Sequence, residues 1–391
     1  MNGAILALNA GSSSIKFALF GPGPGAPARA CHGAIEGIGT APHFVAQDPA
    51  GATLTEQTYP VAATHEALLD GLLDFVAGHL PDAPLIGVGH RVVHGGTAFA
   101  GPVRVNAAVL DALAALTPLA PLHQPHNLAP IRVLAASRPG LAQVACFDTA
   151  FHRSMGTLAT RFALPRALHQ AGVRRYGFHG LSYEYLARRL AVLAPEVAQG
   201  RVIAAHLGNG ASLCALRAGR SVETTMGFTA LDGLMMGTRS GALDPGAVLY
   251  LIAQRGMTAA EVSALLYDRS GLLGVSGISS DMRVLLDSAD PHAAEAVALF
   301  CARVRHQVGA LAAALEGVDG LIFSAGIGEH AAPVRAAVCG GLGWLGVRLD
   351  AAANARGAGR ISTPGSAVAV FVIPTDEEAT IARHVTEVLD G

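Results

Sequence analysis

The pattern of apolar and polar positions predicts two strands at the beginning of the chain. Apolar runs at 4–8 and 15–20 flank the polar hexad Asn9-Ala10-Gly11-Ser12-Ser13-Ser14, a pattern that predicts a β-hairpin. Closely spaced backbone N–H groups, three hydroxyls and Lys16 in such a turn suit a bound phosphate. The alternative is an ordinary hairpin turn rich in serine and glycine.

The same strand–turn–strand pattern occurs again in the second half of the chain. Residues 201–220, RVIAAHLGNGASLCALRAGR, predict an apolar strand, a turn at 208–212 and a second apolar strand. A strand–turn–strand pattern suited to an anion, present once in each of two domains, indicates a nucleotide or phosphate bound between the two domains. A third Gly-rich turn at 320–330 follows a buried strand, and its glycines let the backbone approach a nucleotide closely. The sequence lacks both the G-x-x-x-x-G-K-[ST] loop and a helix-opening G-x-G-x-x-G, which argues against Walker and Rossmann sites.

Helical periodicity separates these strands. Apolar residues recur at i, i+3 and i+4 in 64–79, 182–193, 291–315 and 375–389. Strands alternating with helices indicate an α/β fold. A chain of 391 residues is too long for one ordinary core, so we expect two domains, 1–150 and 151–374, with helix 375–391 packing back on the first.

Composition narrows the class of protein. Hydrophobic residues make up 51% of the chain and its mean hydropathy is +0.41, but the most apolar stretches are too short or contain arginines. The N-terminus has no basic region typical of a signal peptide, so we expect a soluble, cytoplasmic protein. A net charge of -2 gives no electrostatic reason to expect nucleic acid or an anionic membrane as partner. The five cysteines are scattered without a C-x-x-C pair, which suggests neither a disulfide framework nor a thiolate metal site.

Positive charge is placed selectively. Of the 27 lysine and arginine residues, only Lys16 is a lysine, and it lies in the first hairpin, where a compact ammonium would meet phosphate. Arg91 in GHRVVHGG, Arg239 in MGTRSG and His179 in RRYGFHG would form a cationic clamp for a carboxylate and a phosphoryl group if the fold brings them together. The alternative for each arginine is a surface position.

Two carboxylates follow apolar strands. Asp148 ends the run QVACF, where it is either the N-cap of the next helix or a magnesium ligand. Thr375 and Glu378 have the spacing of a capping box at the start of the last helix, which leaves Glu377 for a metal. The histidine pairs in HRVVH and HQPH lack the features of a zinc-protease motif, so we do not expect histidine-bound zinc.

With these residues in hand, the whole chain resembles the acetate and propionate kinase family, in the superfamily of sugar kinases, heat-shock chaperone ATPase domains and actin. Ten blocks occur in the family's order: LNAGSSSIKF, GHRVVHGG, PLAPLHQPHNL, FDTAFH, YGFHG, HLGNGAS, MGFTALDGLMMGTRSG, SGISSDMR, FSAGIGEH and TDEEATIA. The resemblance implies an α/β, two-domain actin-like ATPase (ribonuclease H-like) fold with mixed sheets. It further implies a duplicated βββαβαβα core and a cleft between the domains.

The resemblance implies a reversible, Mg²⁺-dependent transfer of the ATP γ-phosphoryl group to acetate, giving acetyl phosphate and ADP. Mn²⁺ is a second possible metal, and the family is typically homodimeric. An acetate carboxylate is already ionised at pH 7, so no general base is needed. The reaction instead needs alignment and neutralisation of the charge spread over three phosphoryl oxygens. We favour direct in-line transfer over a phosphorylated Glu377.

The resemblance also carries a set of site residues. The implied catalytic residues are Arg91, His123, Asp148, His179 and Arg239, and the implied acyl pocket is Arg91, Val93, Leu122, Phe178 and Ala230. Metal contact falls to Asn9 and Glu377. Nucleotide and phosphate contacts fall to Asn9, Ser12, Ser14, Lys16, His206, Leu207, Gly208, Asn209, Gly210, Asp281, Met282, Arg283, Gly326, Ile327, Gly328 and His330.

Departures from the family pattern bear on the substrate. Ala230 stands where acetate kinases commonly have proline, and the smaller residue leaves room for a methylene, so a propionate or broader short-chain acyl kinase is the alternative. Val93 keeps the larger side chain expected of acetate enzymes. His330 and Asp376 stand where asparagine is common. From other classes, a chaperone-like ATPase switch would need a further substrate-binding segment, and a sugar kinase would need a catalytic aspartate as base.

Overall fold

The computed structural model describes residues 3–11, 13–23, 27–79, 83–357 and 359–391. The chain divides into two compact units. Unit 1 is Met1–Phe151 with Asp376–Gly391, and unit 2 is His152–Thr375. Among the described residues, no helix is both long enough and apolar enough to cross a membrane.

In the described residues, unit 1 contains one mixed sheet of eight strands in the order β5-β4-β3-β2-β1-β6-β8-β7. Strands β1 to β5 are antiparallel neighbours, whereas β6 runs parallel to β1 and β8 parallel to β6. The bounds are β1 (Ala4–Ala10), β2 (Ser14–Gly21), β3 (Ala28–Glu36), β4 (His43–Gln47), β5 (Thr53–Thr58), β6 (Leu85–Val92), β7 (Val103–Arg104) and β8 (Ala142–Phe147).

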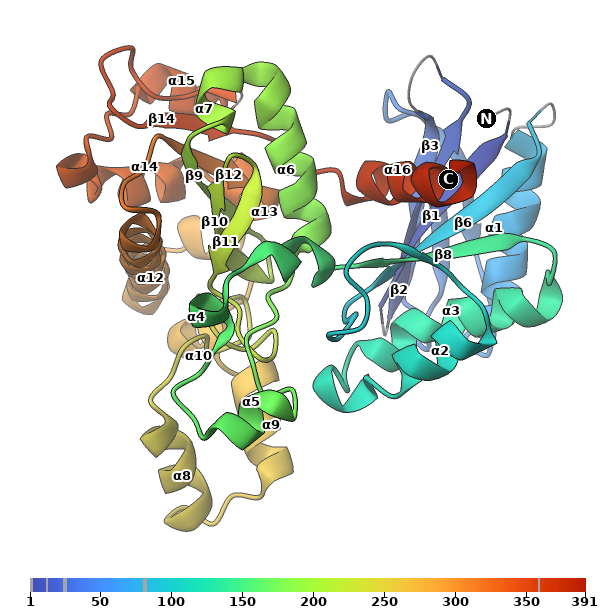
Figure 1. Cartoon of the computed structure of the whole chain (residues 1–391), viewed down its shortest axis with the longest axis horizontal. Coiled ribbons are helices and arrows are strands. Elements are labelled where there is room, and N and C mark those ends of the chain that lie inside the picture. Colours follow the sequence, from blue (N-terminus) through green and yellow to red (C-terminus); the bar gives the residue numbers. More distant parts are fainter. Residues whose placement is uncertain (1–2, 12, 24–26, 80–82, 358) are drawn as a thin grey trace. The chain divides into compact units, whose positions relative to one another are not determined.

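Helices cover the sheet of unit 1 and close its apolar core. The last helix, α16, contacts β1, β6 and β8 although it comes from the end of the chain (Figure 1). It fits closely because β6 has glycine there: a Cβ on Gly89 would lie 2.3 Å from the Ile381 side chain. The helices of unit 1 are α1 (His65–His79), α2 (Ala107–Ala114), α3 (Gln124–Ser137) and α16 (Glu377–Asp390), with short 3-10 turns η1 (Thr117–Leu119) and η2 (Ala150–Ser154), the latter running into unit 2.

Unit 2 repeats the strand plan of unit 1. Its sheet has the order β11-β10-β9-β12-β14-β13, with β9, β10 and β11 antiparallel and with β12 and β14 parallel to β9. The bounds are β9 (Arg201–Leu207), β10 (Ala211–Arg217), β11 (Arg220–Thr224), β12 (Gly320–Ser324), β13 (Gly359–Arg360) and β14 (Ala369–Val372). The order β3-β2-β1-β6-β8 thus matches β11-β10-β9-β12-β14, so the predicted fold class and its duplicated core are confirmed.

The helices of unit 2 vary widely in length. The longest, α12, carries a row of buried apolar residues and contacts β9, β10 and β11. The bounds are α4 (Thr157–Thr160), α5 (Arg166–Gln170), α6 (Gly180–Leu193), α7 (Pro195–Ala198), α8 (Pro245–Ala253), α9 (Ala259–Asp268), α10 (Gly271–Ser276), α11 (Met282–Leu286), α12 (Pro291–Leu315), α13 (Ala325–His330), α14 (Ala332–Gly340), 3-10 turn η3 (Gly343–Leu345) and α15 (Ala351–Arg356).

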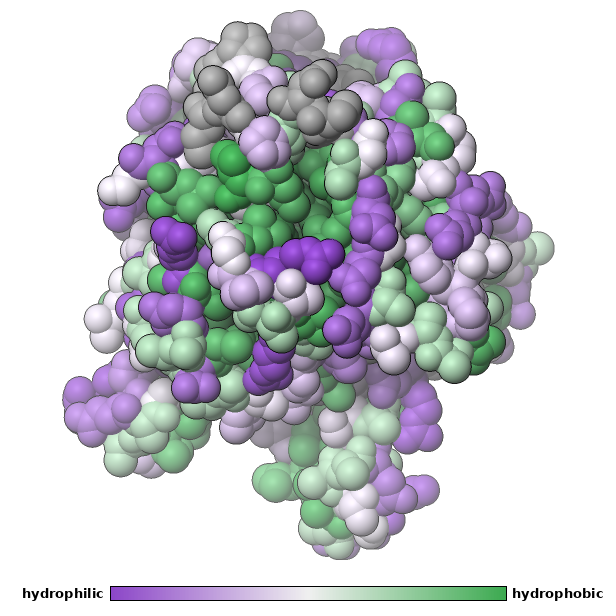
Figure 2. Space-filling model, turned by 90° about the vertical axis from the view of Figure 1, so that its right-hand side faces the viewer, coloured by the Kyte–Doolittle hydropathy of each residue, from purple (hydrophilic) through white to green (hydrophobic). Residues whose placement is uncertain are grey.

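The high apolar content of the sequence also reaches the surface. The face of the molecule in Figure 2 carries an apolar area bordered by hydrophilic side chains. Exposed large apolar residues occur in both units, with Val61 62% exposed in unit 1 and Leu158 92% exposed in unit 2. The mean hydropathy therefore reflects both full cores and apolar surface.

Both predicted hairpins and all four predicted helices are confirmed, with ends that differ by one or two residues. The prediction of a Gly-rich turn at 320–330 is wrong after the strand, because Ala325–His330 forms the short helix α13. The predicted capping box at the last helix is also wrong. Asp376 is the N-cap, accepting a hydrogen bond from Ala379 N at 2.9 Å, while the Thr375 hydroxyl bonds to Ser182.

Unit 1 buries a histidine that should make it sensitive to acid. His90 in β6 is 1% exposed, and burial lowers its pKa to about 4, an effect that the neighbouring Gln143 side chain only partly offsets. Between pH 6.5 and 4, His90 is protonated in the unfolded chain but not in the folded chain. The free energy of unfolding therefore falls as the pH falls. The shift from 6.5 to about 4 corresponds to a loss of about 3 kcal/mol.

Urea unfolding at pH 7.5 and 5.0 measures this effect. We expect His90→Leu to lose clearly less stability between the two pH values than the unmodified chain. The exposed His79→Gln variant should follow the unmodified chain. Equal pH dependence in His90→Leu would contradict the assignment.

Candidate active site

The first group of candidate residues gathers at one edge of the sheet in unit 1. Because β1, β6 and β8 are parallel, their carboxyl ends meet at that edge and bring together Asn9, Arg91 and Asp148. The Arg91 guanidinium donates to Asp148 through Nη2 at 2.6 Å and Nε at 3.2 Å, and to Asn9 Oδ1 through Nη1 at 3.1 Å. The Asp148 side chain is 1% exposed, so Arg91 neutralises a buried carboxylate.

Glu377 joins this group as the first residue of α16. Its Oε2 lies 4.0 Å from Arg91 Nε, and its side chain is 17% exposed. Burial raises the pKa of Glu377 to about 7, opposed by the charge of Arg91 and reinforced by that of Asp148. Burial lowers the pKa of Arg91, but the charges of Asp148 and Glu377 outweigh it, so the net shift is upward.

The oxygens of Asn9 and Glu377 suit a magnesium ion. Carboxylate and amide oxygens are typical ligands of Mg²⁺, which commonly keeps several waters and binds substrate phosphates. In the part of the chain that the structure describes, no three His, Cys, Asp or Glu side chains are grouped closely enough to hold a metal alone.

The remaining candidates of unit 1 differ in exposure. Lys16 pairs with Asn9 in the strand register, and Ser14 begins β2. Val93 is 3% exposed, Leu122 is 50% exposed, and His123 is the N-cap residue of α3. Ser12 lies outside the described residues.

Sequence reasoning missed one residue that organises this half. The Asn127 side chain, 3% exposed, donates to the carbonyl of Ala10 at 2.6 Å and accepts from Val93 N at 2.9 Å. It thereby ties the first hairpin turn to the loop after β6. The block PLAPLHQPHNL carries no signal that distinguishes this asparagine from a solvent-exposed one.

The second group of candidates lies in unit 2 around the turn of the hairpin β9–β10. A Cβ built on Gly210 would lie 3.4 Å from Nε2 of His179 and 3.8 Å from Nη1 of Arg239. Both side chains therefore lie beside the turn at Gly210. Arg239 is held by the carbonyl of Ala230, to which Nη1 donates at 3.0 Å.

His179 is fixed on two sides. It has a left-handed backbone, φ 59°, at the N-terminus of α6, and its Nδ1 lies 2.9 Å from Ser212 Oγ. Its ring stacks on that of His206 with centroids 4.1 Å apart. Phe178 beside it is 2% exposed, and its carbonyl lies 2.9 Å from His152 Nε2. Nε2 of His179 therefore faces the glycine turn in a defined orientation.

A cavity of about 660 Å³ in unit 2 is lined by eight of the sixteen predicted nucleotide-binding residues. Its lining includes Gly208, Asn209, Asp281, Met282, Arg283, Gly326, Ile327 and His330, and it adds Ser280, Leu286, Ala331 and Pro333. Leu207 and Gly328 are buried and do not line it, whereas His206 lies at the end of β9. A mainly apolar pocket beside a glycine turn suits a base and ribose with phosphates at the turn.

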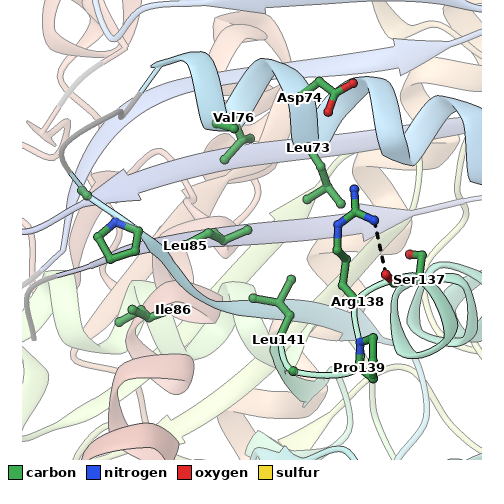
Figure 3. A pocket seen from close by; sticks show the side chains of 13 residues that line it. Leu73, Asp74, Val76, Leu85, Ile86, Ser137, Arg138, Pro139 and Leu141 are labelled. Carbon is green, nitrogen blue, oxygen red and sulfur yellow. Dashed lines mark hydrogen bonds between the residues drawn. The ribbon is translucent and has the colours of Figure 1, made fainter.

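Unit 1 holds a separate cavity of about 870 Å³ between α1, the start of β6 and the end of α3 (Figure 3). Leu73, Val76, Leu85 and Leu141 line it, and the guanidinium of Arg138 donates to the Ser137 carbonyl at 3.2 Å. None of the predicted site residues lies in it. We therefore keep the candidate site to the sheet edge of unit 1 and the turn and cavity of unit 2.

Comparisons with known proteins show the family of this chain. The model of the acetokinase family matches residues 4–383. An acetate kinase of Rhodopseudomonas palustris (strain TIE-1) is 55% identical over 396 residues, covering 100% of both chains. The crystal structure of a Francisella tularensis propionate kinase has a TM-score of 0.90 at 36% identity, covering 98% of both chains. That of Porphyromonas gingivalis acetate kinase has a TM-score of 0.89 at 36% identity, covering 99% of this chain and 100% of the other.

Proposed function

Because the chain belongs to the acetokinase family, we propose that it transfers the γ-phosphoryl group of ATP reversibly to acetate, giving acetyl phosphate and ADP. The family match over residues 4–383 carries this proposal, and the two groups of side chains supply the chemistry. Incubation with ATP, Mg²⁺ and acetate followed by hydroxylamine trapping tests it. Acetohydroxamate should form, whereas ADP formation that requires glucose instead of acetate and gives no hydroxamate would favour a sugar kinase.

Charge neutralisation explains why cationic groups dominate the site. The acetate carboxylate attacks as an anion, and negative charge spreads over the transferred group. Arg91 would bind the acetate carboxylate, held in place by the paired Asp148. His179 and Arg239 would stabilise the equatorial oxygens in flight beside Gly210. In direct in-line transfer the acetate oxygen bonds to the γ-phosphorus as its bond to ADP breaks, with no phosphoenzyme, so we prefer it to a phosphorylated Glu377.

The other predicted residues complete the binding of the nucleotide. Asn9 and Glu377 would hold Mg²⁺, which when bound neutralises charge on the phosphates; Mn²⁺ has the same ligand preference. Ser12, Ser14 and Lys16 would contact phosphate, and His123 would line the site. The cavity beside Asn209 and Gly326 would take the adenosine. We also propose a cytoplasmic location, where ATP is available.

Ala230 is the residue on which the choice of acyl group is expected to depend. Its carbonyl accepts from Arg239, and no described hydrogen bond uses its N–H, so proline there breaks no described hydrogen bond. We expect Ala230→Pro to increase the preference for acetate over propionate by about tenfold, because lost space for one methylene costs roughly 1 to 3 kcal/mol.

Steady-state kcat/KM for both acids measures this change. An unchanged ratio in a folded Ala230→Pro variant would remove Ala230 from the acyl pocket. A starting preference for propionate would favour the second candidate function, a propionate kinase.

Helix α8 supports the proposal that the protein is a homodimer. Its sequence, PGAVLYLIA, is apolar throughout, yet it contains no buried residue. Leu249 is 66% exposed, Tyr250 54% and Ile252 41%. An apolar helix surface of this kind is typical of an interface with a second copy of the chain.

We expect Leu249→Glu to shift the protein from dimer to monomer, because it places a charge on that surface. Sedimentation velocity measures the shift. Val192→Glu, at a 73% exposed position on α6, is the control and should remain dimeric. A dimeric Leu249→Glu variant would exclude α8 as the interface.

A further inference from the structure

The segment that leaves β14 at the end of unit 2 is held by three hydrogen bonds. Ile373 N donates to the Phe323 carbonyl at 3.1 Å, which continues the pairing of β14 with β12. Thr375 N then donates to Oε1 of Glu329 at 3.1 Å, and the Thr375 hydroxyl lies 2.7 Å from Ser182 Oγ. Thr375 is the last residue of unit 2, so the chain is fixed where it passes into unit 1.

Glu329, which accepts from Thr375 N, belongs to α13, the helix that lines part of the proposed nucleotide cavity. The neighbouring α13 residues Gly326, Ile327 and His330 line the cavity, whereas the Glu329 carboxylate turns back to the start of the helix. There Oε1 also accepts from Ala325 N at 2.7 Å. Ala325 has a left-handed backbone, φ 62°, which costs roughly 1 kcal/mol or more for a residue with a Cβ. The carboxylate oxygen therefore holds an unfavourable helix start and Thr375 N at once.

The hydroxyl of Thr375 is linked through side chains to the β9–β10 turn, which is proposed to bind phosphate. Ser182 Oγ, its partner, lies 2.9 Å from Nδ1 of His206, whose ring stacks on His179. Thr375 is thus linked through Glu329 to α13, beside the proposed adenosine cavity. Through Ser182 it is linked to His206 and His179, beside the β9–β10 turn. Two residues further along the chain comes Glu377, 4.0 Å from Arg91.

Resting on the proposed function, we propose that Glu329 is a positioning residue for Glu377. By holding Thr375 N, it fixes the residue that precedes Asp376, the N-cap of α16, and a nucleotide bound against α13 would strengthen that hold. The nucleotide thereby helps to align the carboxylate proposed to bind Mg²⁺. Glu329 itself contacts no reacting atom, and its role requires the acceptor oxygen at the reach of a glutamate side chain rather than its charge.

Three variants of Glu329 separate the effect of its side-chain length from the effect of its negative charge. Glu329→Gln keeps an acceptor at the same distance and should stay within about threefold of the unmodified kcat. Glu329→Asp keeps the charge but is one methylene shorter, and Glu329→Ala has no acceptor; both should lose about tenfold or more in kcat at saturating ATP and acetate. The exposed Glu295→Ala on α12 is the matched control and should match the unmodified chain.

Hydrogen exchange of the peptide spanning 373–380, with and without ADP and Mg²⁺, gives a readout that needs no turnover. In the unmodified chain ADP should slow this exchange, and in Glu329→Asp and Glu329→Ala it should not. An active Glu329→Asp with an inactive Glu329→Gln would overturn the proposal, because charge would then matter. Weaker ADP binding by calorimetry with unchanged kcat and exchange would also overturn it. Exchange protection without acetate turnover would defeat only the proposed function.

Discussion

Replacing Arg91 with leucine should lower kcat/KM for acetate by roughly 10³ to 10⁵, the range over which one arginine acts in related phosphoryl transfer. Arg91 provides the only guanidinium described in contact with both Asn9 and Asp148. Its removal takes away the proposed grip on the acetate carboxylate. Steady-state kinetics of the purified variant measure the loss, and Arg91→Lys should recover only part of it, because an ammonium cannot form the same paired contacts.

The same change leaves the Asp148 carboxylate, 1% exposed, without its cation, so the single variant is also expected to lose stability. The double variant Arg91→Leu with Asp148→Asn removes that charge and separates folding from catalysis. It should unfold nearer to the unmodified chain and remain inactive. Arg138→Leu, at a half-exposed arginine of unit 1, is the control. Activity within tenfold of normal in the folded double variant would contradict the role of Arg91.

Replacing Arg239 with leucine should cost a similar factor, roughly 10³ to 10⁵, and mainly in kcat. Its Nη1 lies 3.8 Å from the position that a Cβ on Gly210 would take, beside His179, and charge on the transferred group is proposed to develop there. An interaction made mainly in the transition state lowers kcat and kcat/KM together. Steady-state kinetics with ATP varied at saturating acetate measure the changes in kcat and KM separately.

Arg220→Leu, at an exposed arginine of β11, is the matched control for Arg239→Leu and should keep normal kinetics. Calorimetry of ADP binding checks that the nucleotide cavity is intact in both variants. A change confined to KM, with kcat preserved, would assign Arg239 to substrate binding alone.

Much of the fold follows from local signals in the sequence. Alternating apolar runs around glycine and serine turns predict both hairpins, and helical periodicity predicts α12 with its ends. The exceptions depend on distant contacts. Residues 325–330 form a helix rather than a turn because Glu329 caps its start, and Asp376 rather than Thr375 caps α16 because Thr375 bonds to Ser182 instead.

The site is less accessible to sequence reasoning than the fold. Arg91, Asp148 and Glu377 could be named, but that Arg91 is engaged with Asp148 depends on the alignment of β6 with β8. Asn127 was missed because nothing in a single sequence distinguishes a buried, bridging asparagine from a solvent-exposed one. The roles of the named residues stay predictions until they are measured.

The ratio of kcat/KM for acetate to that for propionate, measured with ATP and Mg²⁺ on the purified protein, tests the central claim most directly. We predict turnover of both acids with a preference for acetate of about tenfold or more, equivalent to about 1.4 kcal/mol. Propionate turnover equal to or faster than that of acetate would contradict the assignment of acetate as substrate. No turnover of either acid would contradict the assignment of carboxylate phosphorylation itself.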